Sequence, residues 1–363
     1  MPSRDFSPAR RRLTALRLAA QGIVRPRGDS APDDPTEVVR DLLAMQAQDY
    51  PGALWSLGLR TASATRSQIE TVHETGAFVR SWPMRGTLHF VVAEDLPWML
   101  SVTGERMVRA AEGRRRQLEL EQAEFDRAER IARERLHGGA TISRAALFEA
   151  WEHGGLPTTG QRGVHLLGQL AQTAVLVLVG QNEYALLEHR VPDPRIPDRP
   201  DALREFALRY FLSHGPATER DFAWWSSLTL TEARSAIAAA REQLDELELD
   251  GVRYYLRPGL EPAARAVRLL PGFDEYLLGY SDRSAPLSGA DTAVIVPGGN
   301  GMFLSTVVVN GEVVGSWRRT ARAKRVDLEL VPLHGIPDST RSGIAAAAKR
   351  YGAFLGQRVE LLP

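Results

Sequence analysis

The sequence predicts an α+β protein made of three tandem winged helix-turn-helix units and a C-terminal β-rich subdomain. Three successive segments each contain helices with apolar residues spaced three or four positions apart, followed by two β-prone runs around a short turn. Helices followed by a hairpin are the order of elements in a winged helix-turn-helix. Beyond these segments the sequence becomes mainly β-prone. We therefore expect the units at residues 1–120, 121–195, 196–262 and 263–363.

The first unit opens with an amphipathic helix and continues with a well-signalled second one. Leu13 and Leu16 belong to an apolar stripe at helical spacing. Asp34 followed by Pro35 is typical of a helix N-terminus, and Pro51 predicts where this second helix has ended. The expected elements are helices over residues 8–22, 34–48 and 66–74, and a hairpin over residues 78–92 with its turn at residues 83–86.

The second and third units repeat this order. In the second we expect helices over residues 121–136 and 160–172, a helix that follows residues 141–143 and runs to 153, and strands over 174–179 and 183–188. After the proline-rich linker at residues 192–200, the third unit begins with a helix over 201–213. Thr218 and Thr231 are expected to cap the next two helices, the second of which runs to about residue 244. Asp250-Gly251 is a type I′ turn signal between strands at 246–250 and 252–257.

The C-terminal subdomain is predicted from its turns and its alternating residues. Asn310-Gly311 is the clearest hairpin signal in the chain, with strands at 307–309 and 312–317. A strand at 326–331, a helix at 339–354 and a final strand at 358–362 complete the expected elements.

Composition excludes several classes of protein. Of 363 residues, 44% are hydrophobic and 25% charged, which is typical of a globular protein with a sizeable core. The chain has no cysteine, which excludes disulfides, Cys-ligated zinc, iron–sulfur clusters and a thiol nucleophile. The longest apolar run, residues 174–179, is far shorter than the ~18 residues of a membrane span, and no apolar signal segment is evident. We expect a cytoplasmic protein with no membrane partner.

The net charge is zero, but nearly all of the positive charge comes from arginine. Lys and Arg together number 45, as do Asp and Glu, yet Lys324 and Lys349 are the only lysines. Arginine binds phosphates and bases in a bidentate manner, although a GC-rich genome would also enrich it. A net charge of zero permits a basic face, so nucleic-acid binding stays open.

The common catalytic motifs are missing. Both lysines follow alanine, so the chain has no GxxxxGK[ST] phosphate loop, and it has neither a GxSxG elbow nor HExxH spacing. We expect no metal and no cofactor.

Long stretches resemble a known family. Residues 269–283, LLPGFDEYLLGYSDR, and residues 307–318, VVVNGEVVGSWR, are similar to signatures of the winged-helix DNA-binding family that contains the AlkZ- and YcaQ-type DNA glycosylases. Residues 85–89, RGTLH, also resemble it, and the resemblance covers nearly the whole chain. It implies tandem winged helices that form a C-shaped channel for duplex DNA, with the catalytic motif near its centre.

The resemblance also implies catalytic residues. The AlkZ branch carries Gln–apolar–Gln and the YcaQ branch Gln-x-Asp. Gln46-Ala47-Gln48 matches the first pattern, although Ala47 is small and Asp49 follows directly. On a regular helix Gln46 and Gln48 lie about 200° apart, so they could line one pocket only if the helix ends or distorts here. The alternative is that Gln48 and Asp49 only satisfy backbone groups at a helix end.

Glutamine limits the chemistry. It does not titrate near neutrality, but it can orient a water and stabilise positive charge on the sugar. That help suits a cationic N7-alkylpurine, whose glycosidic bond is already labile. No lysine lies near the motif to form a Schiff base, so we expect a monofunctional glycosylase without lyase activity. The resemblance suggests bulky lesions, including interstrand crosslinks from an alkylating natural product, in self-resistance or general repair; whether the base is flipped stays open.

Further residues are candidates for contact with double-stranded DNA. These are Arg85 and His89 in the first wing, the run Arg114, Arg115 and Arg116, and the cluster Arg318, Arg319, Arg322, Lys324 and Arg325 after the last hairpin signal. Solvated surface charge or core packing is the alternative for each. The tryptophans Trp82, Trp224, Trp225 and Trp317 are expected in the core, and residues 273–276 could face the channel.

Two other functional classes stay open. A non-catalytic transcriptional regulator would bind an undamaged operator, and a winged-helix scaffold would bind protein with no salt-dependent DNA affinity. The chain has no heptad repeat for dimerisation, and tandem units can wrap DNA alone, so we expect a monomer.

Overall fold

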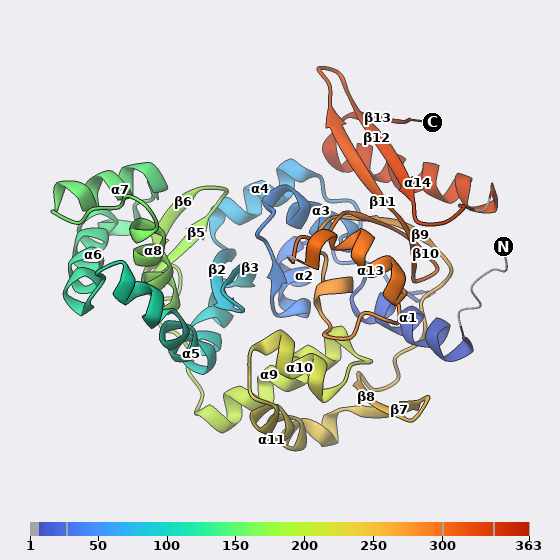
Figure 1. Ribbon diagram of the computed structural model, residues 1–363, viewed down its shortest axis with the longest axis horizontal. Helices are drawn as coiled ribbons and strands as arrows, with labels where there is room; N and C mark the ends of the chain where they lie inside the picture. The colour runs from blue at the N-terminus through green and yellow to red at the C-terminus, as the bar shows by residue number, and fades with distance from the viewer. Residues whose placement is uncertain (1–6, 27, 300, 337, 363) are drawn as a thin grey trace.

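The computed structural model describes residues 7–26, 28–299, 301–336 and 338–362, and it confirms the α+β class. Figure 1 shows a helical group at one end, the C-terminal strands at the other, and a third helical group below the middle. Among the described residues, no helix is both long and apolar enough to cross a membrane.

The first unit differs from its prediction around the glutamine motif. The second helix, predicted to reach residue 48, ends at Leu42, because Leu43 has a left-handed φ of +64°. Met45–Gln46 instead form the short strand β1, and Pro51 begins a helix rather than following one, since its missing N–H is tolerated in a first turn. The helices are α1 (Pro8–Ala20), α2 (Pro35–Leu42), α3 (Tyr50–Arg60) and α4 (Arg66–Thr75), and the hairpin is β2 (Phe78–Met84) and β3 (Thr87–Val92).

The hairpins of the first two units join in one sheet. Its strand order is β1-β3-β2-β5-β6-β4, and Arg80 of β2 lies opposite Leu178 of β5. The long helix α5 (Leu96–Gln117) leads from the first hairpin into the second unit. That unit contains α6 (Gln122–Arg135), β4 (Ile142–Ser143), α7 (Arg144–His153), α8 (Arg162–Gln172), β5 (Leu176–Val179) and β6 (Glu183–Leu186), as its pattern predicts.

The third unit packs against the first hairpin. Phe206 and Trp225 share a buried cluster with Val79 and Val91 of that hairpin. Thr229, not Thr231, caps the last helix, because its side chain accepts the Glu232 N–H. The elements are α9 (Arg199–His214), α10 (Glu219–Ser226), α11 (Leu230–Ala240), β7 (Asp245–Leu249) and β8 (Val252–Leu256).

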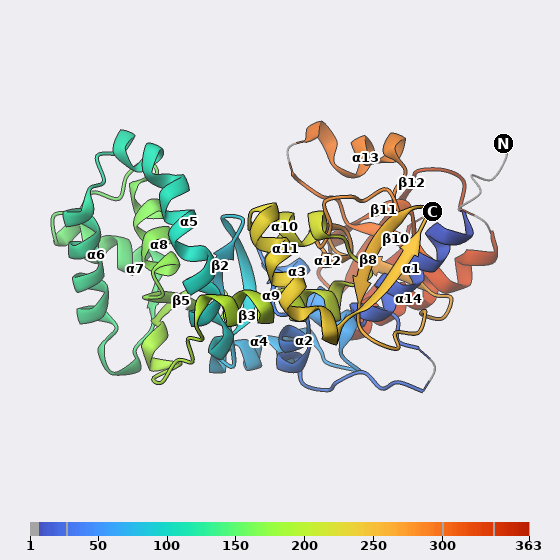
Figure 2. The ribbon, with the colours of Figure 1, turned by 90° about the horizontal axis from the view of Figure 1, so that it is seen from below.

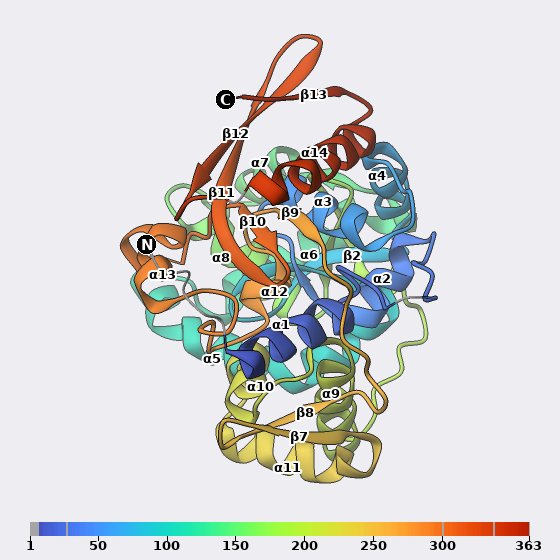
Figure 3. The ribbon, with the colours of Figure 1, turned by 90° about the vertical axis from the view of Figure 1, so that its right-hand side faces the viewer.

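A five-stranded sheet closes the chain and packs on the first unit. Its order is β13-β12-β11-β10-β9, and Trp55 of α3 contacts Tyr351 and Phe354 of the C-terminal helix. The hairpin β11–β12 projects from the body in Figures 1 and 3. The elements are β9 (Val267–Leu270), α12 (Glu275–Leu278), α13 (Gly289–Ile295), β10 (Thr306–Val309), β11 (Glu312–Ala321), β12 (Arg325–Pro332), α14 (Arg341–Leu355) and β13 (Arg358–Leu361).

Candidate functional site

The glutamine motif lies on extended backbone at the edge of the shared sheet. Gln46 pairs with His89 of β3, and the Ala47 N–H donates to the Leu88 carbonyl at 2.7 Å. In a strand, residues i and i+2 project to the same side, whereas in a helix they do not. Because β1 ends at Gln46 and Gln48 lies in the bend that follows, the strand fixes the position of Gln46 alone.

The two glutamine side chains differ in their surroundings. Gln46 is 8% exposed and lines a cavity, and no hydrogen bond joins its amide to another described residue. Gln48 is exposed, lies outside that cavity lining, and its Oε1 accepts the Leu88 N–H at 3.2 Å. The Gln46 amide is therefore the one available to a water or substrate inside the cavity.

We call this space the Gln46 cavity. Its volume is 710 Å³, within the range of ligand-sized sites. Gln46 and Thr87 line one part of it, Arg85 and Trp224 another. Trp224 is 37% exposed, so the expectation that it lies in the core is wrong. The other lining residues are Leu278, Arg283, Gly289, Thr292, Ala293, Val296, Gly298, Gly299, Gly301 and Phe303.

The turn of the first hairpin holds Arg85 in this cavity. Arg85 and Gly86 both have positive φ values, +55° and +66°, as in a two-residue type I′ turn. The Arg85 N–H donates to Ser227 Oγ at 3.1 Å, which fixes the turn against the end of α10. Its guanidinium donates to the Leu278 carbonyl at 3.0 Å and to His89 Nε2 at 2.8 Å.

His89 supports Arg85 rather than DNA. Its Nδ1 donates to the Thr87 carbonyl at 2.8 Å, which leaves Nε2 to accept from Arg85. Burial, reinforced by the charge of Arg85, lowers the pKa of His89 to about 3, so the imidazole is neutral at pH 7. The side chain has no exposed surface, so the prediction of a direct His89 contact with DNA is wrong for this conformation.

A buried carboxylate, Glu275, lies beneath the glutamine motif; the sequence analysis named residues 273–276 as able to face the channel but gave Glu275 no role. Glu275 has no exposed surface; its Oε1 accepts the Gln46 N–H at 2.9 Å, and its Oε2 accepts from Trp225 Nε1 at 2.9 Å. His214 Nε2 lies 3.4 Å from Oε2, and Arg85 lies 3.9 Å from Oε1. Burial raises the pKa of Glu275, but His214 and Arg85 outweigh burial and lower it to about 2.

Glu275 therefore carries a negative charge that fixes the β1 backbone at Gln46. The sequence signal that could have marked Glu275 was an acidic residue within an otherwise apolar segment, residues 275–278. The neighbouring Asp274 pairs with buried Arg60 at 2.9 Å, and the Tyr276 hydroxyl donates to the Gly311 carbonyl. The Arg60–Asp274 pair holds the C-terminal segment to the first unit, whereas the Tyr276 hydrogen bond lies within the C-terminal segment.

The three arginines at the end of α5, Arg114, Arg115 and Arg116, differ in their exposure. Arg115 is 4% exposed and its guanidinium donates to Gln169 and to Gln172, so the prediction that it contacts DNA is wrong for this conformation. Arg114 and Arg116 are exposed, and Arg114 donates to Gln161 at 2.9 Å. Only these two remain candidates for a surface contact.

The C-terminal basic cluster lies on the projecting β11–β12 hairpin. Arg322 and Arg325 pair with Asp327 at 2.8 and 2.7 Å, which neutralises part of their charge. Arg319 donates to the Tyr351 hydroxyl. The side chains of Arg318 and Lys324 are exposed, and no hydrogen bond or ion pair links either side chain to another described residue.

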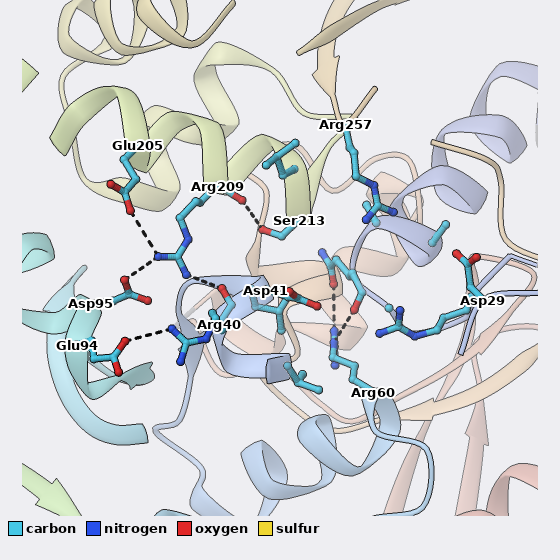
Figure 4. A pocket seen from close by; sticks show the side chains of 18 of the residues that line it. Asp29, Arg40, Asp41, Arg60, Glu94, Asp95, Glu205, Arg209, Ser213 and Arg257 are labelled. Atoms are coloured by element: carbon cyan, nitrogen blue, oxygen red, sulfur yellow. Dashed lines mark hydrogen bonds and ion pairs between the residues drawn. The ribbon is translucent and has the colours of Figure 1, made fainter. Parts of the chain in front are cut away.

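A second, larger cavity lies away from the glutamines. It has a volume of 810 Å³ between α1, α2 and α9. Figure 4 shows that its charged side chains face one another: Arg209 points toward Asp95 and Glu205, and Arg40 toward Glu94. Because these charges are paired internally, we assign this cluster to the joint between the first and third units.

This joint gives a stability prediction. Arg209 donates to Asp95 Oδ1 at 2.7 Å and to the Arg40 carbonyl at 2.6 Å, and its side chain is 18% exposed. We expect Arg209→Ala to lower the free energy of unfolding by about 2 kcal/mol, because it leaves Asp95 with one side-chain partner. Arg195→Ala removes an exposed pair with Glu205 and is the control, with an expected change below about 0.5 kcal/mol. Equal urea midpoints for both variants would contradict this assignment.

The described residues contain no group of three or more His, Asp or Glu side chains placed to hold a metal ion. The Gln46 cavity is lined by a neutral amide and two guanidiniums, those of Arg85 and Arg283, and the neutral imidazole of His89 and the carboxylate of Glu275 lie behind Arg85 and Gln46. Such a set can orient water and stabilise positive charge, but it offers no group that titrates near pH 7.

Comparisons with known proteins agree on one family. The family model for DNA glycosylase AlkZ-like matches residues 39–354. A Streptomyces sahachiroi protein described as an interstrand DNA cross-link repair glycosylase is 26% identical over 364 residues, covering 93% of this chain and 94% of that protein. The solved structure of Streptomyces sahachiroi DNA glycosylase AlkZ matches with a TM-score of 0.76 at 20% identity, over 97% of this chain and 99% of that one.

Proposed function

Because the chain belongs to the AlkZ-like DNA glycosylase family, we propose that it is a monofunctional DNA glycosylase that excises cationic N7-alkylpurines from duplex DNA. The observation that carries this proposal is the Gln46 side-chain amide, which lines a ligand-sized cavity and has no hydrogen bond to another residue that the structure describes. The match to a crosslink-repair glycosylase supports interstrand crosslinks as substrates. Self-resistance to an alkylating natural product is one setting for this activity, and general repair is the other.

In the proposed reaction the C1′–N9 bond breaks with its electron pair going to the purine. The cationic N7-alkylpurine thereby leaves as a neutral base, so no acid is needed to protonate it. Positive charge builds on the sugar, where the Gln46 carbonyl dipole stabilises it and orients a water. The water oxygen bonds to C1′ and releases a proton to solvent. Gln48, whose Oε1 accepts the Leu88 N–H outside the cavity, contributes to this reaction by holding the motif against β3.

Glu275 has a positioning role in this account. Its Oε1 accepts the Gln46 N–H and lies 3.9 Å from Arg85, which lines the cavity. A fixed β1 backbone holds the Gln46 amide in one orientation, and pre-organised dipoles are what this kind of catalysis requires.

We interpret the three groups of helices and hairpins as winged helix-turn-helix units arranged around duplex DNA. Figure 2 supports this arrangement: α5 and α13 project to the same side of the molecule, with α10 and α11 between them. The exposed arginines Arg114, Arg116 and Arg318, together with Lys324, then contact phosphates, and a monomer suffices.

Unhooking of a crosslink tests the proposed activity. Purified protein without added metal is incubated with a duplex joined by one N7-guanine crosslink, and the strands are separated on a denaturing gel. We expect the crosslinked band to give single strands that break on alkali treatment. Trapping of a covalent protein–DNA complex by borohydride would contradict the absence of lyase activity. Salt-sensitive binding without excision of either a crosslink or N7-methylguanine would favour a regulator instead.

The basic hairpin gives a separate prediction about binding. We expect Arg318→Ala/Lys324→Ala to weaken binding to undamaged duplex DNA and to reduce the slope of log K against log salt by about 2, because each phosphate contact contributes about 0.9. Arg341→Ala is the control, since Arg341 is exposed but pairs with Asp338 outside the hairpin. Fluorescence anisotropy at several salt concentrations measures the slope. If the slope of the double variant equals that of wild type, the β11–β12 hairpin does not contact DNA.

A further inference from the structure

Another cavity lies where the first unit meets the C-terminal subdomain, away from the glutamine motif. Its volume is 440 Å³, and α3, β9 and α14 supply most of its walls. We call it the α14 cavity. Figures 2 and 3 place α14 on one side of strands β10 and β11, and α13, which lines the Gln46 cavity, on the other. The α14 cavity is therefore separated from the Gln46 cavity by the C-terminal sheet.

The floor of the α14 cavity is apolar. Trp55 and Leu59 of α3 and Leu269 of β9 line it, and each is at most 2% exposed. The Trp55 Nε1 donates to the Leu269 carbonyl at 2.7 Å, so the indole N–H is already satisfied and the ring offers carbon surface. On α14, the small side chains of Ala346 and Ala347 leave the space above this floor open. The floor therefore suits an aromatic or aliphatic group.

Two half-buried arginines line the same cavity, and both lack an acidic partner. Arg268 donates to the carbonyls of Ile23 and Val267 at 3.1 and 3.0 Å, and Arg350 Nη2 donates to three carbonyls at the end of α3. No ion pair joins either guanidinium to a carboxylate that the structure describes, and no Asp or Glu lines the cavity. Carbonyls carry only partial charges, so two full positive charges remain.

The two positive charges also oppose each other. Burial lowers the pKa of Arg268 to about 10, and the charge of Arg350 lowers it further; burial lowers the pKa of Arg350 as well. Both side chains stay protonated at pH 7, and Arg265 adds a third positive charge at the exposed edge. The Arg268 Nη2 and the Arg350 Nε and Nη1 donate to no described residue. A bound anion would accept from these groups and offset the repulsion.

These features together select one class of ligand. Unbalanced guanidiniums disfavour a neutral or cationic molecule, and the apolar floor gives a bare inorganic ion no contact. The cavity between α1, α2 and α9 differs, because Arg209 and Arg40 there pair with acidic side chains. An anion with an apolar body fits both parts of the α14 cavity, since a guanidinium binds carboxylate or phosphate oxygens in a bidentate manner.

We propose that the α14 cavity binds a small amphiphilic anion, with its aryl or alkyl body on Trp55 and Leu59 and its carboxylate or phosphate on Arg268 and Arg350. Because α3 belongs to the first unit and β9 and α14 to the C-terminal subdomain, such a ligand joins the two and stabilises the folded chain. This inference is independent of the proposed glycosylase activity.

Matched compounds test the site by isothermal titration calorimetry with the full chain. 1-Naphthoate and 1-naphthyl phosphate share an apolar body and differ in the charged group; 1-naphthalenemethanol lacks the charge, and inorganic phosphate lacks the body. We expect at least one naphthyl anion to bind and to raise the thermal midpoint, and the alcohol and inorganic phosphate to bind at least about tenfold more weakly. The tighter of the two anions identifies the preferred charged group.

Variants place the binding in this cavity. Arg268→Gln removes one charge and is expected to weaken the naphthyl anion about tenfold, as loss of a charge-assisted hydrogen bond predicts. Ala346→Leu fills the cavity without altering either arginine; Ala346 is exposed and leucine favours helices, so the variant folds and is expected to bind more weakly too. Arg341→Gln is the control on the same helix, because Arg341 is exposed and pairs with Asp338 outside the cavity.

Several results would overturn the site. These are no binding of either naphthyl anion at millimolar concentration, equal affinity for the alcohol or inorganic phosphate, and an Ala346→Leu protein with wild-type affinity. Displacement of the naphthyl anion by undamaged duplex DNA would instead assign these arginines to the DNA interface, and would also overturn it.

Discussion

The Gln46→Ala/Gln48→Ala protein is expected to excise N7-methylguanine at least about 100-fold more slowly than wild type. Removing a pre-organised dipole from a developing charge typically has an effect of this size. The Gln46 side-chain amide lines the cavity and bonds to no other residue in the described part of the chain, so its loss removes a group available to water or substrate. Single-turnover rates from alkali-revealed abasic sites measure the effect.

The single variants Gln46→Ala and Gln48→Ala separate an effect on the excision rate from an effect on stability. Gln48→Ala removes the acceptor of the Leu88 N–H and is expected to lower the free energy of unfolding by about 1 kcal/mol. Gln46→Ala breaks no such bond, so its expected unfolding midpoint equals that of wild type while excision falls. Gln243→Ala, an exposed glutamine near α11, is the control for both measurements. A Gln46→Ala protein with full activity would contradict its catalytic role.

Loss of the Glu275 carboxylate is expected to have the largest effect on stability. Glu275→Ala removes the buried carboxylate that four polar groups contact. These groups are the Gln46 N–H, the Trp225 indole N–H, His214 and Arg85. Breaking a buried charged pair in this way costs about 3–5 kcal/mol. Urea unfolding at pH 7 measures the change, and a decrease below about 1 kcal/mol would show that these contacts do not stabilise the fold.

The pH dependence of the stability tests whether Glu275 is ionised in the folded protein. Burial raises the pKa of Glu275, but its cationic and N–H partners lower it to about 2, below its ordinary value of 4.5. A folded-state pKa below the unfolded value stabilises the protein above about pH 5, and this contribution is lost as the pH falls toward 2. Glu275→Gln keeps the size but not the charge. We expect the stability difference between wild type and Glu275→Gln to shrink with falling pH; a constant difference would contradict an ionised Glu275.

Local turn chemistry made much of the fold predictable. Asp250-Gly251 and Asn310-Gly311 each form a two-residue hairpin, because both residues of these pairs readily adopt the positive φ that such turns require. The helices of the second unit follow from their apolar spacing and lie where the pattern predicts them. These features depend on residues within a few positions of one another.

Non-local contacts account for what the sequence could not predict. The helix predicted through Gln48 ends early because residues 45–47 pair with β3, about forty positions later in the chain. Pairing of β2 with β5 joins two hairpins that sequence alone treats as separate wings. Glu275 contacts the Gln46 N–H and Trp224 lines the Gln46 cavity from other units, so the sequence could suggest that residues 273–276 face the channel but could not join either residue to Gln46.

Release of free base tests the central claim most directly. Wild type, Gln46→Ala and buffer alone are incubated with duplex DNA that carries one N7-methylguanine, and free N7-methylguanine is quantified by mass spectrometry alongside abasic sites. Our account predicts that wild type releases one base for each abasic site, at a rate far above buffer, and that Gln46→Ala does not exceed buffer. Equal release by wild type and Gln46→Ala would contradict the role of Gln46. Release by wild type that does not exceed buffer would contradict glycosylase activity toward this lesion.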